Sequence, residues 1–290
     1  MKKLIKSLIP PIMLDKFYLL SNYKYFLKYK DLISKNIELK DKHRGKRCFL
    51  LGSGPSIKKE NLKPLKDQIV FALNNFYVHD DFAHIMSGDV EKYYMTAPIH
   101  PPQTEDEWKA WFEDMENNIP KDVNMLFGLN KYDGNIKNII DKYDIFKEHK
   151  INWYFAGIPT NEYYNFSQNE IDLTNMVLNA NTVSIYALLA SIYMGFDEIY
   201  LLGMDHNYVC KSEVDYRFYK HSIHQKDETK RMSDMYNYKS YNKRLFGGMV
   251  QIFNHYQILN ENSNCKIYNT SKDSLLDIFD FRNFKKIVEG

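Results

Sequence analysis

A run of small and polar residues, Gly52-Ser53-Gly54-Pro55-Ser56, is the strongest candidate for binding chemistry in this chain of 290 residues. We call it the GSGPS turn. The apolar residues 48–51 before it predict a buried strand, and residues 57–65 after it predict a short helical stretch. A glycine turn between a strand and a helix lets backbone N–H groups approach phosphate oxygens, and the helix N-terminus adds positive potential. The GSGPS turn is therefore predicted to bind an anion, with a plain tight turn as the alternative.

The GSGPS turn differs from two common phosphate-binding motifs. It lacks the GK[ST] ending of a Walker loop, and Ile57 stands where the dinucleotide fingerprint requires its third glycine. Pro55 suits the first turn of a helix, and Ser56 adds a hydroxyl donor beside it. The motif alone indicates a phosphate site without naming the ligand.

Two asparagines follow the next predicted strand, residues 69–73. The side chain of Asn74 offers a donor and an acceptor to a ligand at the carboxyl end of that strand, and Asn75 stands beside it. Because asparagine also suits turns, a residue that simply leaves the strand is the alternative for Asn74.

Asp89 ends a Ser-Gly-Asp sequence that follows a third predicted strand, residues 84–87. Ligands collect at the edge of an open α/β sheet, so this carboxylate is a candidate to bind a ribose hydroxyl, a metal ion or an acceptor. The alternative is an N-cap for a helix that starts at Val90.

A second glycine-containing segment, Gly203-Met204-Asp205-His206, directly follows the predicted strand at 198–202. We call it the GMDH segment. Its glycine permits a close backbone approach, and its polar residues are expected to face the same cleft as the GSGPS turn. Asp205 together with Asp89 suggests a magnesium pair, because hard cations favour carboxylates.

Residues 206–241 form a long polar stretch, which is predicted to be a lid over the site. His221 and His224 lie in it among lysine, arginine and tyrosine side chains. Histidine titrates near neutral pH and so suits a general base that deprotonates an acceptor hydroxyl, whereas cations and phenols suit a leaving phosphate. His206 competes for the role of base, and a solvated loop is the alternative for the whole stretch.

Three segments together resemble the motifs of bacterial lipooligosaccharide sialyltransferases: the GSGPS turn, the residues Leu73-Asn74-Asn75-Phe76-Tyr77, and the residues Tyr200-Leu201-Leu202-Gly203-Met204-Asp205. They are also similar to a broader set with flagellin-modifying nonulosonate transferases and a pterin diphosphokinase-like group. The resemblance covers roughly residues 47–276. In the sialyltransferases the first motif is GNGPS and the second has glutamine after asparagine, so Ser53 and Asn75 depart from the pattern.

The resemblance implies a Rossmann-like, mostly parallel sheet flanked by helices, as a variant of the GT-A fold with an active-site lid. It implies metal-independent transfer, without a cofactor, of an acidic sugar from a CMP-activated donor to a glycan or lipid-linked glycan. The sugar is left open among sialic acid, a related nonulosonate and Kdo. The family's catalytic histidine follows its lid, but the aligned residues 241–248 contain none. The residues expected around the donor are Gly52, Ser53, Gly54, Pro55, Ser56, Asn74, Asn75, Thr182, Ser184, Gly203 and Asp205.

Two other functions stay open. A pterin diphosphokinase-like transferase would use ATP and Mg²⁺ with Asp89 or Asp205. A nucleotide-binding or glycan-binding accessory protein would retain the GSGPS turn without an aligned base, and Thr182 and Ser184 would then simply cap the helix that they precede.

The elements that must position these residues alternate along the chain. Strands are also predicted at 123–127, 151–155 and 266–268, and the clearest helix at 182–194 ends before Gly195. Such alternation predicts an α/β fold with a parallel sheet. The segments 98–120 and 206–241 are interpreted as insertions into one domain.

Composition limits the class of protein. The chain has 44% hydrophobic residues and 39 Lys and Arg against 37 Asp and Glu, which favours an ordinary globular protein and gives no general case for nucleic-acid binding. Its 3 cysteines are widely spaced, which fits a reducing compartment better than a disulfide framework. We expect a cytoplasmic protein, and a homo-oligomer is left open.

The N-terminal segment, residues 1–46, is rich in lysine and aromatic residues and precedes the domain predicted at 47–290. It is predicted to form amphipathic helices. An interfacial helix on the anionic inner membrane is one interpretation, and a helix packed on the domain or on a partner is the other. A short apolar run broken by prolines argues against a signal peptide.

Overall fold

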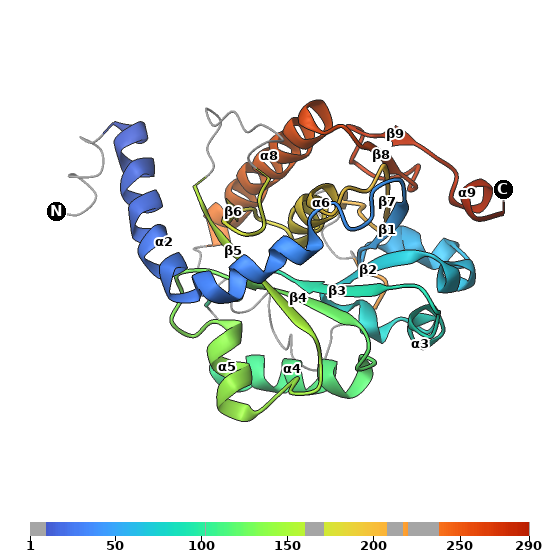
Figure 1. Cartoon of the computed structure of the whole chain (residues 1–290). Coiled ribbons are helices and arrows are strands. Elements are labelled where there is room, and N and C mark those ends of the chain that lie inside the picture. Colours follow the sequence, from blue (N-terminus) through green and yellow to red (C-terminus); the bar gives the residue numbers. More distant parts are fainter. Residues whose placement is uncertain (1–9, 102, 160–170, 208–216, 220–237, 290) are drawn as a thin grey trace.

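The computed structural model describes residues 10–101, 103–159, 171–207, 217–219 and 238–289. Within these ranges the chain folds around a nine-stranded sheet in which every neighbouring pair is parallel (Figure 1). The strands are β1 (Arg47–Leu51), β2 (Ile69–Leu73), β3 (Lys92–Thr96), β4 (Asn124–Leu129), β5 (Ile151–Ile158), β6 (Met176–Leu178), β7 (Glu198–Leu202), β8 (Lys266–Asn269) and β9 (Asp280–Phe281). The predicted α/β class with helices flanking a mostly parallel sheet is confirmed.

Helices connect the strands and cover both faces of the sheet (Figure 1). The α-helices are α2 (Pro11–Ile33), α3 (Phe82–Met86), α4 (Glu105–Asn118), α5 (Ile136–Tyr143), α6 (Val183–Tyr193), α8 (Tyr238–Asn262) and α9 (Phe284–Glu289). Short 3-10 turns are η1 (Ser34–Leu39), η2 (Pro55–Lys59), η3 (Lys63–Asp67) and η4 (Asn74–Val78). None of the helices in the described ranges is both long and apolar enough to cross a bilayer.

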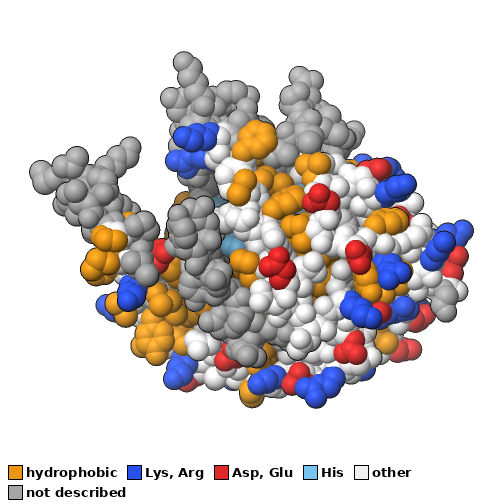
Figure 2. Space-filling view, turned by 90° about the horizontal axis from the view of Figure 1, so that it is seen from above, with side chains coloured by type: hydrophobic (Ala, Val, Ile, Leu, Met, Phe, Trp, Pro, Cys, Tyr) orange, Lys and Arg blue, Asp and Glu red, His pale blue; other side chains and the backbone are white. Residues whose placement is uncertain are grey.

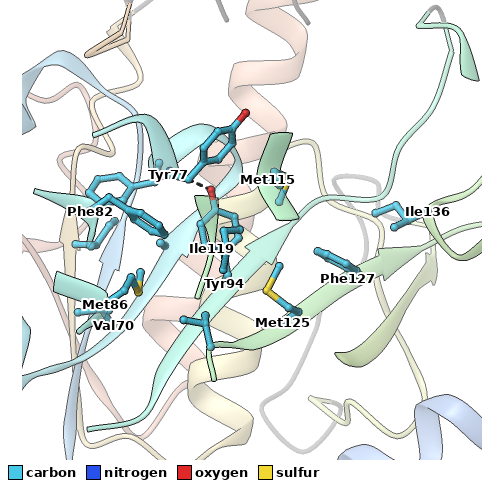
Figure 3. Packing of buried hydrophobic residues seen from close by; sticks show 14 of the residues in the cluster. Val70, Tyr77, Phe82, Met86, Tyr94, Met115, Ile119, Met125, Phe127 and Ile136 are labelled. Carbon is cyan, nitrogen blue, oxygen red and sulfur yellow. Dashed lines mark hydrogen bonds between the residues drawn. The ribbon is translucent and has the colours of Figure 1, made fainter. Parts of the chain in front are cut away.

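Side chains alternate between the two faces along each strand, as the period of two requires. In β1, Phe49 and Leu51 belong to the buried cluster that includes residues of α3, α4 and α5, whereas Cys48 and Leu50 belong to the cluster that includes residues of α6 and α8. Figure 3 shows the first of these layers, where the backbone N–H of Tyr77 donates to the Tyr94 hydroxyl at 3.2 Å. Because both faces are covered, the strands are continuous apolar runs.

The strand predicted at residues 84–87 is wrong, because these residues lie in α3 and the turn after it. Phe82, Ile85 and Met86 are buried and fall on one side of a helix, at spacings of three and four residues. The strand that follows is β3, which the sequence did not suggest. Its first residue, Lys92, is buried and donates to the carbonyl oxygens of three residues at 2.6 to 3.1 Å.

Residues 98–120 are not an insertion, because they contain the crossover helix between β3 and β4. Thr104 caps α4, and its side chain and backbone exchange hydrogen bonds with Glu107 in a capping box. The buried residues Trp111 and Phe112 attach the helix to the sheet. The segment is therefore part of the core layer.

The order of the strands creates a switch point beside β1. The sheet order is β6-β5-β4-β3-β2-β1-β7-β8-β9, so the chain moves outward in one direction up to β6 and then returns to the other side of β1. In open α/β sheets, ligands bind beyond the carboxyl ends of the strands at such a point. The GSGPS turn follows β1 and the GMDH segment follows β7, so both lie there.

Helix α2 packs along β5 in the opposite direction to the strand. The Asn22 side-chain amide donates to the carbonyl oxygen of Gly157 at 2.6 Å. The ring of Phe26 lies 6.0 Å from that of Phe155, centre to centre. Earlier residues of α2 therefore lie nearer the carboxyl end of β5.

Candidate functional site

The GSGPS turn and the GMDH segment are held against each other by backbone hydrogen bonds. The N–H of Gly52 donates to the carbonyl of Leu202 at 2.8 Å, and the N–H of Gly54 donates to that of Gly203 at 2.8 Å. The pairing of β1 with β7 thus continues beyond the ends of both strands. The two predicted segments meet, as their positions after neighbouring strands imply.

Both glycines of the GSGPS turn are required by this approach. A Cβ at Gly52 would lie 2.6 Å from the carbonyl oxygen of Gly203. A Cβ at Gly54 would lie 2.6 Å from that oxygen and 2.6 Å from Oδ2 of Asp205. Gly203 has φ +64°, a left-handed conformation that glycine adopts without a steric penalty. The glycines of these turns therefore have a packing role.

Asp205 fastens the two turns together. Its carboxylate accepts the backbone N–H of Ser56 at 2.7 Å and the Ser56 hydroxyl at 2.5 Å. That hydroxyl also lies 2.6 Å from the hydroxyl of Ser271, which follows β8. Asp205 is only 3% exposed. The carboxylate therefore occupies the start of η2, where the sequence predicts a ligand phosphate.

The remaining binding capacity of the GSGPS turn lies at Ser53. The N–H groups of Gly52, Gly54 and Ser56 have protein acceptors, and Pro55 has no N–H. In the part of the chain that the structure describes, the Ser53 N–H and hydroxyl have no hydrogen-bond partner, although its carbonyl accepts from Phe218 N–H at 2.8 Å. Of the groups in the GSGPS turn, only the N–H and hydroxyl of Ser53 therefore remain as candidates to bind an anion.

Asn74 lies at the carboxyl end of β2 in a left-handed conformation, with φ +50°. Its carbonyl accepts the Tyr94 hydroxyl, which fixes the backbone there. Its side-chain amide has no hydrogen-bond partner among the described residues. A non-glycine residue held at positive φ stores backbone strain, and such residues cluster at ligand sites.

Asn75 differs from its neighbour because the protein uses its side chain. Its Oδ1 accepts the indole N–H of Trp111 at 2.5 Å, and its Nδ2 donates to the hydroxyl of Tyr219 at 3.1 Å. Asn75 is buried and links α4 to the segment around Tyr219. The prediction that it contacts the donor stays a prediction, while the structure shows this bridging contact.

Between residue 207 and the start of α8, the structure describes only residues 217–219 of the predicted lid. Phe218 is buried, and its ring centre lies 5.5 Å from that of Phe76 and 4.9 Å from that of His79. Together with the bond to Ser53, these contacts place Phe218 over the turns after β1 and β2. His221 and His224 lie outside the described residues, so their catalytic role stays a prediction.

A chain of hydroxyl groups leads to His206. The Thr182 hydroxyl lies 2.9 Å from that of Ser184, which lies 2.5 Å from the Tyr256 hydroxyl, and this in turn lies 2.8 Å from Nε2 of His206. Thr182 is the N-cap residue of α6, but its side chain makes no capping bond. The predicted alternative, that these hydroxyls cap the helix, therefore does not hold for Thr182.

His206 has an unusual backbone and environment. Its φ is +49°, and burial lowers the pKa of its imidazole to about 4. The ring is therefore neutral at pH 7. Tyr256, on α8, was not recognised in the sequence, because it lies 50 residues beyond His206 inside an ordinary apolar helix pattern.

Asp89 does not lie at this edge, so its predicted position is wrong. It precedes β3 instead of following a strand, and no helix starts at Val90. It lines a separate cavity of about 540 Å³ at the amino ends of the strands, together with Arg47 and Glu91. A five-residue strand spans roughly 16 Å, so Asp89 and Asp205 are too far apart to share one magnesium ion.

The fold defines an α/β protein in which two paired turns meet at the switch point of a parallel sheet, the position where open α/β sheets usually bind their ligands. No protein-family model matches the chain, and no curated protein sequence matches it. Two solved structures are similar in chain course. One is the sialyltransferase CstII from Campylobacter jejuni in complex with a substrate analogue, cytidine-5'-monophosphate, at 16% identity and a TM-score of 0.45. The match covers 83% of this chain and 88% of that one. The other is the sialyltransferase CST-II with a trisaccharide acceptor and CMP, at 18% identity and a TM-score of 0.44, covering 81% and 85%.

Proposed function

We propose that this protein is a glycosyltransferase that moves an acidic sugar from a CMP-activated donor to a glycan acceptor. One observation supports a ligand at this edge most directly. Ser53 and Asn74, at the carboxyl ends of the adjacent strands β1 and β2, present polar side chains that have no partner among the described residues. The resemblance of the three sequence motifs supplies the identity of the nucleotide.

In this proposal Ser53 and Asn74 bind different parts of the donor. The Ser53 N–H and hydroxyl are donors, which suits them to phosphate oxygens. The Asn74 amide donates and accepts, which suits it to the base, the ribose or the sugar. Because Asp205 is engaged with Ser56, we assign it to holding the turns in place and not to the ligand.

The acceptor hydroxyl needs a base, and His206 is the candidate whose surroundings the structure describes. Its Nε2 lies 2.8 Å from the Tyr256 hydroxyl, and we assign the neutral imidazole to take the proton of the acceptor hydroxyl. The acceptor oxygen then bonds to the anomeric carbon while the bond from that carbon to the phosphate of CMP breaks. Tyr256 acts as a positioning residue, since its hydroxyl holds the ring.

Metal-independent transfer remains part of the proposal, with no carboxylate pair assigned to an ion. The pterin diphosphokinase-like alternative loses its suggested magnesium pair, because Asp89 and Asp205 lie at opposite edges of the sheet. Individual carboxylates could still serve that reaction, so nucleotide preference is the property to test.

A thermal-shift panel with CMP, CDP, UDP, GDP and ATP, each with and without Mg²⁺, tests the proposal. We expect CMP to give the largest rise in melting temperature, independent of Mg²⁺, and CMP-sialic acid or CMP-Kdo to be consumed when a glycan mixture is added. Mg²⁺-dependent stabilisation by ATP alone would contradict the proposal. Binding of CMP with no consumption of any CMP-sugar would favour the accessory protein.

A further inference from the structure

Helix α2 is apolar on two opposite sides, although only one of them is covered. Asn22, Phe26 and Ile33 are buried against the sheet. At 3.6 residues per turn, a second set of large apolar residues falls on the opposite side. These residues are exposed, with Phe17 at 62% and Leu20 at 66%. The outward set is Met13, Phe17, Leu20, Tyr23 and Leu27.

Between residues 13 and 28 the charges on this outward side are basic, and the exposed Asp31 follows one turn after Leu27 on the same side. Lys16 and Lys24 are exposed and fall among the outward apolar residues. Asp15 is the acidic residue between positions 13 and 28, and it is half-buried on the side of α2 that faces the sheet. Aromatic and aliphatic side chains mixed with lysines are typical of helices that lie in the interface of an anionic bilayer.

The first half of α2 extends past the carboxyl edge of the sheet. The Asn36 amide, just after α2, donates to the carbonyl of Trp153 near the start of β5, while Asn22 reaches Gly157 near its end. Residues before Asn22 therefore lie beyond that end. The Nζ of Lys131, which follows β4, lies 4.9 Å from the centre of the Tyr18 ring.

The figures agree with this position of α2. Figure 1 shows the helix projecting from the body, and Figure 2 shows hydrophobic side chains gathered on the same side of the molecule. The projecting half points away from the amino edge, where Asp89 lies, and toward the edge that carries the candidate site.

We propose that the outward side of α2 docks on an anionic lipid surface. The exposed stripe from residue 13 to residue 27 is roughly 20 Å long, enough to lie along a bilayer interface. A symmetric pair of α2 helices is disfavoured, because Lys24 lies within the stripe and two copies would bring like charges together. Lipid phosphates instead match the lysines, and the apolar side chains enter the acyl boundary.

This docking gives the site an orientation. The lipid surface runs along α2, whose first half extends past the edge of the sheet that carries Ser53 and Asn74. This step alone rests on the proposed function: the acceptor of the transfer is a lipid-linked glycan presented at that surface. Lipid binding itself needs neither donor nor acceptor.

Vesicle flotation of the full chain tests the docking, with vesicles of phosphatidylcholine alone or with phosphatidylserine. We expect binding to the anionic vesicles, weakened by salt. Lys16→Gln with Lys24→Gln should weaken it about 30-fold, at about 1 kcal/mol for each lysine. Phe17→Ser with Leu20→Ser should weaken it about 100-fold. Ile37→Ser, at a residue 63% exposed in η1, is the matched control and should bind like the wild type.

The outcomes separate docking from folding and from the proposed activity. Each variant should keep the wild-type melting temperature and the wild-type stabilisation by CMP. Equal flotation of all variants, or no flotation of the wild type, would overturn the proposal. A concentration-dependent dimer that the Phe17→Ser and Leu20→Ser changes abolish in the absence of lipid would assign the stripe to a second copy, and would overturn it as well.

Discussion

Replacing Asp205 by alanine should destabilise the protein strongly, because the carboxylate fastens the two turns of the site. The change removes the acceptor of the Ser56 N–H, at 2.7 Å, and an acceptor of the Ser56 hydroxyl, at 2.5 Å. The Ser56 N–H is then left without this acceptor in a half-buried position. Hydrogen bonds to charged groups contribute about 1.5–3 kcal/mol each, so the loss should be about 4 kcal/mol. At about 2.1 cal/mol/K per residue, 290 residues give an unfolding entropy of about 0.6 kcal/mol/K. The melting temperature should therefore fall by about 7 °C.

Differential scanning calorimetry measures this fall, and two variants act as controls. Asp205→Asn keeps one oxygen for the Ser56 N–H and should lose about 2 °C. Asp273→Ala removes an exposed ion pair with Lys59 and should change the melting temperature by less than about 1 °C. If Asp205→Ala melts within about 2 °C of the wild type, Asp205 does not hold the turns, and the assignment of its carboxylate must be revised.

Three further predictions concern the candidate site. Asn74→Gly keeps the left-handed backbone accessible while it removes the amide, so CMP binding in a calorimetric titration should weaken about 10-fold at an unchanged melting temperature; equal affinity would exclude the amide from the site. Tyr256→Phe removes the hydroxyl beside His206 and should lower kcat at least about 10-fold with little change in the KM of the donor, whereas an equal kcat would exclude a positioning role. Burial lowers the pKa of His206 and of His255 to about 4, so the unfolded chain takes up these protons near pH 6.5 and the folded chain only near pH 4. This contribution to stability is complete above about pH 6.5 and is lost toward pH 4, and His206→Gln should make the fall in melting temperature over that range smaller; an unchanged or steeper fall would contradict the burial of a neutral ring.

The strands that were predicted correctly have a simple pattern. β1 and β7 are short apolar runs that end at a glycine, and the buried position of both faces explains why their residues do not alternate. β3 was missed because it begins with Lys92 and contains two tyrosines. The structure explains the lysine, since its ammonium group bonds backbone carbonyls from the preceding segment, a contact that no local pattern encodes.

The sequence predicted where the candidate site lies, but not the hydrogen bonds within it. The two glycine-containing turns follow strands, and parallel strands bring such turns to one edge. The bond between Ser56 and Asp205 joins residues 149 positions apart, so the competition of this carboxylate with a ligand could not be inferred from the turn. Asp89 was misplaced because the helix α3 was taken for a strand, which reversed the edge at which the following turn lies.

A crystal structure of the protein with CMP would show whether Ser53 and Asn74 bind the nucleotide. We expect the nucleotide beyond the carboxyl ends of β1 and β2. A phosphate oxygen should lie within hydrogen-bond distance of the Ser53 N–H or hydroxyl, and the Asn74 amide should contact the ligand. Asp205 should keep its bonds to Ser56. Nucleotide density in the cavity beside Asp89, or at the switch point without contact to Ser53 and Asn74, would show that these two residues do not form the nucleotide site.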